Sequence, residues 1–168
     1  MSTKKYIFEE VSHCEMCGSR ASGHKVLGMR LNVSQGLRPK KKEGIAVTIK
    51  KCSSCDLIYA SPMPVPNNIQ DHYGIPPESY WKPSYFNWDP KYFSNELGRL
   101  KQFMEIKPGM KALDIGAGLG KCMISMEKAG FDVYGIEPSV PFHEKAISKM
   151  GVSPEKLKLG MLEEVNFE

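Results

Sequence analysis

The sequence predicts a mixed α/β protein in which a small N-terminal module with four cysteines precedes a parallel sheet with flanking helices. Two Cys-x-x-Cys pairs lie within the first 60 residues. An apolar run at 110–115 ends in a glycine-rich turn, and a second apolar run at 131–136 ends in an acidic residue. Short apolar runs bounded by glycine are typical of buried parallel strands, so the second half of the chain is expected to form the sheet.

The composition is that of a globular protein with a modest positive charge. The 168 residues are 41% hydrophobic, which suffices for one core and a small module. No apolar run approaches the ~18 residues of a membrane span, and the N-terminus lacks the apolar core of a signal peptide. We therefore expect a soluble, cytoplasmic protein without membrane contact. Residues 1–60 hold 11 Lys and Arg against 5 Asp and Glu, an excess typical of a solvated face.

Four of the five cysteines are expected to bind a metal. In a cytoplasmic chain, paired cysteines indicate metal binding rather than disulfides. Two Cys-x-x-Cys turns supply a tetrahedral structural zinc site, whose ligands here are Cys14, Cys17, Cys52 and Cys55. A redox-active pair and unrelated free thiols are the alternatives.

The other metal-capable side chains are expected outside this site. Four sulfurs complete the zinc shell, so His13 and His24 are expected at the surface. Cys122 is expected to be a small core residue of a helix. The long gap between the cysteine pairs has room for a hairpin with strands at 24–33 and 45–50.

Changes in composition divide the chain into three segments. A proline-rich stretch at 61–68 separates the cysteine module from the rest of the chain. The expected segments are a zinc-binding, ribbon-like module at 1–62, a connector at 63–90 and a truncated sheet domain at 91–168.

The connector is rich in aromatic residues and is interrupted by prolines. Pro76, Pro77 and Pro83 argue against one continuous helix. Its aromatic side chains either pack against the sheet domain or cover a bound ligand, and both interpretations stay open. These residues are His72, Tyr73, Tyr80, Trp81, Tyr85, Phe86 and Trp88.

Hydrophobic periodicity and capping residues place the elements of the sheet domain. Helices and strands alternate after the connector, as in a parallel sheet. The prediction is a helix at 91–106, a strand at 110–115, a helix at 119–129, a strand at 131–136, a helix at 141–150 capped by Ser139, and a short strand at 157–160.

The glycine turn and the acidic residue indicate a nucleoside-binding site. Gly116, Gly118 and Gly120 remove every Cβ from alternate positions of the turn, so a ligand can lie on its backbone amides. Glu137, at the end of the neighbouring strand, is placed to accept hydrogen bonds from two ribose hydroxyls. A tight strand–helix turn without a ligand is the alternative.

The spacing of the glycines distinguishes this turn from a dinucleotide site. The dinucleotide motif is G-x-G-x-x-G, with a pyrophosphate at the helix N-terminus. Here the spacing is G-x-G-x-G, and Lys121 stands at the position of the third glycine. Asp114, before the turn, is badly placed beside two phosphates and well placed to hold an ammonium group. S-adenosylmethionine has an amine and a sulfonium but no phosphate, and it fits this pattern.

These motifs resemble those of class I S-adenosylmethionine-dependent methyltransferases. The stretch Leu113–Gly120 resembles their first motif, and Gly135–Ser139 resembles their ribose-binding strand end. The stretch Cys52–Pro64, together with residues 72–73 and 80–81, is similar to a bacterial group that has an N-terminal zinc-binding domain. That group is similar to sugar C-methyltransferases acting on nucleotide-linked deoxysugars.

The resemblance implies a Rossmann-like sheet and a set of cofactor-binding residues. The family sheet has the strand order 3-2-1-4-5-7-6, of which this chain holds strands 3-2-1. The glycine turn would hold the methionine moiety, Glu137 the ribose, and the residues after the third strand the adenine. Many family members have an acidic residue where this chain has Met161, so apolar or backbone contacts to adenine are expected. The implied residues are Asp114, Gly116, Ala117, Gly118, Gly120, Glu137, Pro138, Met161 and Leu162.

The resemblance also implies methyl transfer to a small molecule, such as a nucleotide-linked sugar. The acceptor-binding and acid–base residues of the family lie mostly after the third strand. We therefore expect the 168-residue chain to be inactive alone, and a missing C-terminal half or a partner chain to complete the sheet. The sequence assigns no catalytic residue.

Two further functions stay open. The first is an RNA methyltransferase whose zinc ribbon contacts RNA, supported by the basic excess of residues 1–60, which includes the stretch Arg38–Lys42. That stretch is more simply interpreted as a solvated loop tip, so nucleic acid is not the favoured partner. The second is a non-catalytic zinc-ribbon binding or scaffold module.

Overall fold

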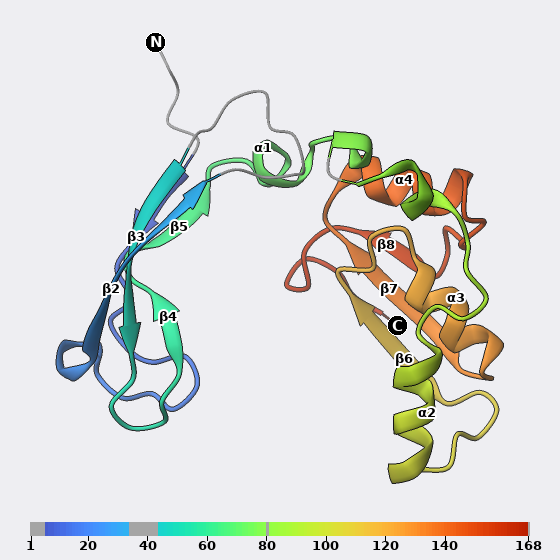
Figure 1. Ribbon diagram of the computed structural model, residues 1–168, viewed down its shortest axis with the longest axis horizontal. Coiled ribbons are helices and arrows are strands. Elements are labelled where there is room, and N and C mark those ends of the chain that lie inside the picture. The colour runs from blue at the N-terminus through green and yellow to red at the C-terminus, as the bar shows by residue number, and fades with distance from the viewer. Residues whose placement is uncertain (1–5, 34–43, 80, 168) are drawn as a thin grey trace. The chain divides into compact units, whose positions relative to one another are not determined.

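The chain forms two compact units, residues 1–71 and 72–168. The computed structural model describes residues 6–33, 44–79 and 81–167 (Figure 1). The basic loop expected at 38–42 lies outside the described residues, as does Tyr80. Antiparallel strands in the first unit and a parallel sheet with helices in the second confirm the predicted α/β class.

The N-terminal unit is built from antiparallel strands. β2 (Lys25–Val33) pairs with β3 (Gly44–Lys51), and β3 pairs with β4 (Ile58–Ala60), so the predicted strand pairing between the two cysteine pairs is confirmed. β1 (Tyr6–Glu9) pairs with β5 (Met63–Pro66), a strand formed by part of the proline-rich stretch. Prolines are tolerated in such a pair because each strand has a free edge.

The connector forms short helical turns in place of one continuous helix, as its prolines predict. They are α1 (Ile69–Tyr73), η2 (Pro77–Ser79) and η3 (Pro83–Phe86). α2 (Ser94–Phe103) follows them. α2 begins three residues later than predicted because Phe93 has a left-handed backbone with φ 63°.

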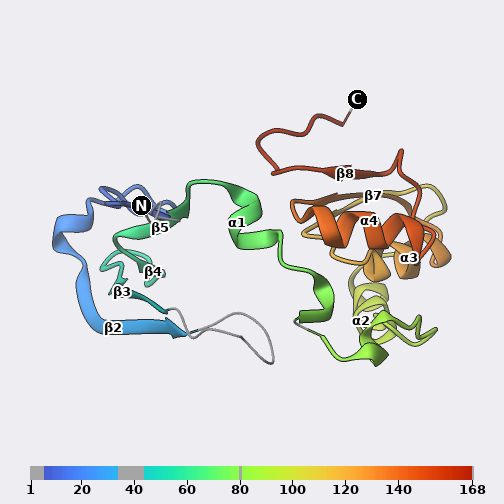
Figure 2. The same ribbon diagram turned by 90° about the horizontal axis from the view of Figure 1, so that it is seen from above.

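The C-terminal unit contains a parallel sheet with the strand order β6-β7-β8. The strands are β6 (Lys111–Ile115), β7 (Asp132–Glu137) and β8 (Leu157–Leu159). α3 (Lys121–Lys128) and α4 (Val140–Ser148) connect them, and both lie on one side of the strands (Figure 2). This arrangement is a partial Rossmann-like fold, which confirms the predicted order of the first three strands.

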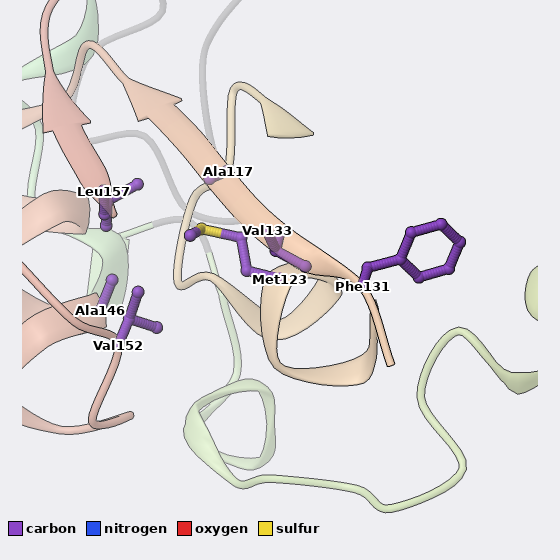
Figure 3. Packing of buried hydrophobic residues seen from close by; sticks show 7 residues of the cluster. All are labelled: Ala117, Met123, Phe131, Val133, Ala146, Val152 and Leu157. Carbon is purple, nitrogen blue, oxygen red and sulfur yellow. The ribbon is translucent and has the colours of Figure 1, made fainter. Parts of the chain in front are cut away.

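The core of this unit lies between the sheet and its two helices (Figure 3). Apolar side chains at helical spacing on α3 and α4 meet alternate residues of the strands, and this burial is the main stabilising force. Ser139 caps α4 as predicted, because its Oγ accepts a hydrogen bond from Phe142 N–H at 3.4 Å. The buried cluster consists of Ala117, Met123, Phe131, Val133, Ala146, Val152 and Leu157.

β6 lies at one edge of the sheet. Among the described residues it pairs with β7 alone. Its side chains Leu113 and Ile115 are 44% and 60% exposed, although a strand in this position of an α/β sheet is ordinarily buried. In the described part of the chain, no helix has both the length and the apolar character needed to cross a membrane.

The close packing at Gly120 gives a first test of the fold. Gly120 has φ 71°, and an added Cβ would lie 2.5 Å from Val152 Cγ2. We expect Gly120→Ala to lower the free energy of unfolding by about 3 kcal/mol, because left-handed strain and overpacking add. Urea denaturation of the zinc-loaded chain measures this loss.

Gly151→Ala is the matched control. Gly151 has φ 74°, but an added Cβ would meet nothing within 4 Å. Only the backbone strain of about 1 kcal/mol is expected there. Equal losses for the two variants would contradict the described contact between Gly120 and Val152.

Candidate functional site

The four predicted zinc ligands come together in the N-terminal unit. The Sγ atoms of Cys14, Cys17, Cys52 and Cys55 all lie within 4.8 Å of one another. The Cys14–Cys55 and Cys17–Cys52 sulfur pairs are each 3.6 Å apart. Zinc–sulfur bonds of ~2.3 Å in a tetrahedron separate the sulfurs by ~3.8 Å, so this cluster has the size of a four-thiolate zinc site.

Both cysteine pairs adopt the same backbone turn. Gly18 N–H donates to Cys14 O at 2.8 Å, and Asp56 N–H donates to Cys52 O at 3.1 Å. The residue after the second cysteine is left-handed in each turn, with φ 73° at Gly18 and 63° at Asp56. Aspartate tolerates this conformation better than most residues, and Asp56 also forms an ion pair with Lys51 at 2.8 Å. The two matching turns direct all four sulfurs to one point.

The sulfurs of Cys17, Cys52 and Cys55 differ in their affinity for protons. A hydrogen bond from Ser19 lowers the pKa of Cys52 to about 5, and Ser19 lowers the pKa of Cys17 as well. The Leu57 amide acts to lower the pKa of Cys55, but burial and the neighbouring sulfurs outweigh it and raise this pKa to about 12. Like charges this close resist simultaneous ionisation, so four thiolates here require a cation among them. The donor set fits zinc.

His24 is buried, so its expected surface position is wrong. Its side chain is only 8% exposed. Its Nε2 lies 3.0 Å from Ser19 Oγ, and its Nδ1 lies 2.5 Å from the Tyr59 hydroxyl. Tyr59 is 35 residues away in the sequence, so local spacing gave no sign of this partner. His13, in contrast, is exposed and contacts Ser12 at 3.0 Å, as expected of a surface residue.

In the C-terminal unit, the carboxyl ends of the three parallel strands meet where the nucleoside site is predicted. Glu137, the last residue of β7, accepts hydrogen bonds from Gly118 N–H at 2.6 Å and from Ser139 N–H at 2.8 Å. Gly160 N–H, directly after β8, donates to Glu137 O at 3.2 Å. The glycine turn, the Glu137 carboxylate and the residues after β8 therefore lie side by side.

A second carboxylate is buried next to this point. Asp114 Oδ2 has no hydrogen-bond partner among the residues that the structure describes. Burial raises the pKa of Asp114. Burial also raises the pKa of Glu137, although the amides of Ser139 and Gly118 act against it. A buried, unpartnered carboxylate oxygen is unfavourable, so this site favours a ligand that brings a cationic donor.

The backbone amides of the glycine turn already have acceptors within the protein. The N–H groups of Gly116 and Ala117 both donate to Ile136 O, at 2.8 and 2.9 Å, and Gly120 N–H donates to Ala117 O at 2.8 Å. Gly118 N–H is held by Glu137. These four amides are thus satisfied within the protein, and the expected contact of the turn with a ligand stays a prediction. What the turn offers is open space, because an added Cβ at Gly116 would meet nothing within 4 Å.

The remaining predicted residues follow the strand ends. Pro138 is half-buried beside Glu137, Met161 is half-buried, and Leu162 is 47% exposed. Glu164 Oε2 accepts a hydrogen bond from Met161 N–H at 3.1 Å. The Glu164 carboxylate thus lies beside Met161, where many members of the resembled family have an acidic residue, although Glu164 comes three residues later in the sequence. Glu164 was not predicted from the sequence, because a turn and not a strand brings it back to Met161.

Connector residues border the glycine turn. Lys121 Nζ donates to Tyr85 O and lies 4.3 Å from the centre of the Tyr85 ring. Ser125, one turn later on α3, donates to Tyr92 O at 2.8 Å. An added Cβ at Gly118 would lie 4.0 Å from the Tyr85 hydroxyl. Tyr85 therefore combines packing on α3 with a position beside the predicted ligand site.

Comparisons with known proteins give distant and partial relatives. No family model matches the chain. The chain is 32% identical over 78 residues, 39% of its length, to an uncharacterized methyltransferase of Anoxybacillus flavithermus WK1, of which it covers 37%. The chain thus spans little more than a third of that relative's length.

Two solved structures show a similar partial likeness. The first is a protein of Anabaena variabilis ATCC 29413 that is ascribed to the methyltransferases of an antibiotic biosynthesis pathway. It is 25% identical to this chain with a TM-score of 0.36, and the match covers 43% of this chain and 28% of that one. A SAM-dependent methyltransferase of Aquifex aeolicus is 24% identical with a TM-score of 0.32, over 48% of this chain and 47% of that one. All three proteins are named as methyltransferases.

The raised pKa of Asp114 predicts how the stability of the ligand-free chain depends on pH. A carboxyl whose pKa is higher in the folded chain stabilises the fold fully below its unfolded pKa of about 3.9. That stability is lost as the pH rises through the raised folded pKa. The amide side chain of Asp114→Asn does not ionise, so this variant keeps that stability as the pH rises. We expect the variant to melt above the wild type at pH 7 and the difference to shrink toward pH 4.

Paired thermal scans of the two chains measure this difference, and effects of pH on the cysteine cluster are common to both. A wild type that melts above Asp114→Asn at pH 7 would show that Asp114 has a partner in the folded chain.

Proposed function

We propose that this chain is the cofactor-binding part of an S-adenosylmethionine-dependent methyltransferase that also carries a structural zinc site. The proposal rests on one observation above all, the two buried carboxylates of Asp114 and Glu137 at the ends of adjacent parallel strands. The likeness to the methyltransferase of Anoxybacillus flavithermus supports it.

The charge of the site favours this cofactor over a dinucleotide. The pyrophosphate of a dinucleotide would meet two buried carboxylates and would be repelled. S-adenosylmethionine brings an ammonium and a sulfonium, both cations, together with two ribose hydroxyls. Asp114 Oδ2 would accept from the ammonium, and the lone pairs that Glu137 keeps beside its two amide contacts would accept from the hydroxyls. Glu164 is a candidate acceptor for the adenine amine.

The residues of this chain would act by binding and orienting. When bound, the cofactor supplies an electrophilic methyl group and a sulfonium leaving group. Asp114 would fix the methionine end of the cofactor and Glu137 its central ribose, and the open backbone at Gly116 would admit it. Tyr85, held on α3 by Lys121, would exclude water from one side of the turn. Alignment and exclusion of water are the main contributions that an enzyme makes to such a displacement.

For the acceptor, we propose a small molecule such as a nucleotide-linked sugar, on the strength of the resemblance around the second cysteine pair. The groups that bind this acceptor and remove its proton would lie on elements beyond β8. We also propose that an additional strand pairs with β6, supplied by a longer chain or by a partner chain. The exposed apolar side chains of Leu113 and Ile115 support this completion of the sheet.

Calorimetric titration with S-adenosylhomocysteine tests the cofactor assignment. We expect the zinc-loaded chain to bind S-adenosylhomocysteine and not NAD⁺. Asp114→Asn should weaken binding by about 10–100-fold, because a hydrogen bond between charged groups contributes roughly 1.5–3 kcal/mol.

Asp132→Asn is the matched control, since Asp132 lies at the opposite end of β7 and forms an ion pair with Lys156 at 3.2 Å. It should bind like the wild type. Absence of binding by the wild type, or equal losses in the two variants, would refute the assignment. If the chain binds RNA, and this binding weakens steeply with salt, RNA would be favoured as the methyl acceptor over a small molecule.

A further inference from the structure

A chain of hydrogen-bonding groups, with the buried His24 at its centre, leads from β4 to the cysteine cluster. The Tyr59 hydroxyl lies 2.5 Å from His24 Nδ1, and His24 Nε2 lies 3.0 Å from Ser19 Oγ. Ser19 Oγ in turn lies 3.1 Å from Cys52 Sγ and 3.2 Å from Cys17 Sγ. Tyr59, which is distant in the sequence, is thus linked through His24 and Ser19 to two of the four sulfurs.

One direction of these hydrogen bonds supplies a donor to the sulfurs. In this direction the Tyr59 hydroxyl donates to His24 Nδ1. A neutral imidazole that accepts at Nδ1 carries its own proton on Nε2, and His24 therefore donates to Ser19 Oγ. The Ser19 proton is then directed to a sulfur. The reverse direction would leave both sulfurs without this donor.

The local structure holds each member in place. His24 directly follows the 3-10 turn η1 (Ala21–Gly23), and its N–H donates to Ala21 O at 3.2 Å. The rings of His24 and Tyr59 meet edge to face, with centroids 5.7 Å apart and planes at 81°. The imidazole therefore has a fixed orientation, with one edge toward Tyr59 and the other toward Ser19.

We propose that Tyr59, His24 and Ser19 form an outer shell of the metal centre that holds metal on Cys52 and Cys17. This inference rests on the proposed zinc site. Zinc with four thiolates has a net charge of −2, and a hydroxyl donor delocalises that charge from the sulfur it contacts. The backbone amides of Cys55 and Ser54 also donate to Cys52, the latter at the longer distance of 3.4 Å. Ser19, His24 and Tyr59 are positioning residues, and none of them ligates the metal.

Competition titration of Zn²⁺ against a chromophoric chelator, on the whole 168-residue chain, measures the effect. Ser19→Ala and His24→Phe should each weaken zinc binding by about 10–100-fold, the range observed for outer-shell partners of metal ligands. Tyr59→Phe should cause a smaller loss. Because His24 acts through Ser19, the double variant that combines Ser19→Ala with His24→Phe should bind zinc no more weakly than Ser19→Ala alone.

Two further variants separate hydrogen bonding from packing. His24→Gln keeps a donor near Nε2 and should recover most of the affinity lost in His24→Phe. His13→Gln, at an exposed histidine beside the same cysteine pair, should bind zinc like the wild type. Ser19→Ala and Tyr59→Phe each remove a single oxygen, so they carry the test if His24→Phe does not fold.

A second readout uses Co²⁺ in place of Zn²⁺. Loss of the Ser19 donor should shift the thiolate-to-cobalt charge-transfer band, which a change in packing alone would leave in place. Affinities of Ser19→Ala and Tyr59→Phe within twofold of the wild type, or additive losses in the double variant, would overturn the outer-shell role alone. A wild type that binds neither metal would overturn the zinc site with it.

Discussion

The contact between Glu137 and the glycine turn determines the geometry of the C-terminal unit's site. One carboxylate oxygen accepts from Gly118 N–H and the other from Ser139 N–H, so a single side chain joins the turn after β6 to the start of α4. The main-chain oxygen of the same residue accepts from Gly160 N–H after β8. All three strand ends are thereby held together at the edge where ligands of parallel sheets bind.

The N-terminal unit depends on a different constraint, the convergence of four sulfurs. Its two sheets are small, and many of their apolar side chains are exposed, including Val26 and Met29 on β2 at 57% and 74%. A unit this small gains little stability from its core alone, and a metal held by the four sulfurs would add to it. The two matching cysteine turns and the buried His24 network explain how this unit would order itself around one ion.

The sequence predicted the elements and missed several contacts between them. Regular periodicity and turn residues located β6, β7, β8 and both helices to within about two residues, and the cysteine spacing identified the four sulfurs. Helix α2 was predicted too long because nothing in the pattern announces a left-handed Phe93. His24 and Glu164 were missed because their partners are supplied by tertiary contacts and turns, which periodicity does not encode. The sequence did not show the acceptors of the turn amides either, since three of these four acceptors lie on the neighbouring strand.

The central claim is that the edge formed by the turn, Glu137 and the residues after β8 binds S-adenosylmethionine. Nitrogen–proton correlation spectra of the zinc-loaded chain, recorded while S-adenosylhomocysteine is added, test this most directly. We expect the largest shifts at the amides of residues 116–120, 137, 139 and 160–162, with residues 6–33 unchanged. Saturable shifts confined to the N-terminal unit, or no shifts at millimolar ligand, would contradict the account.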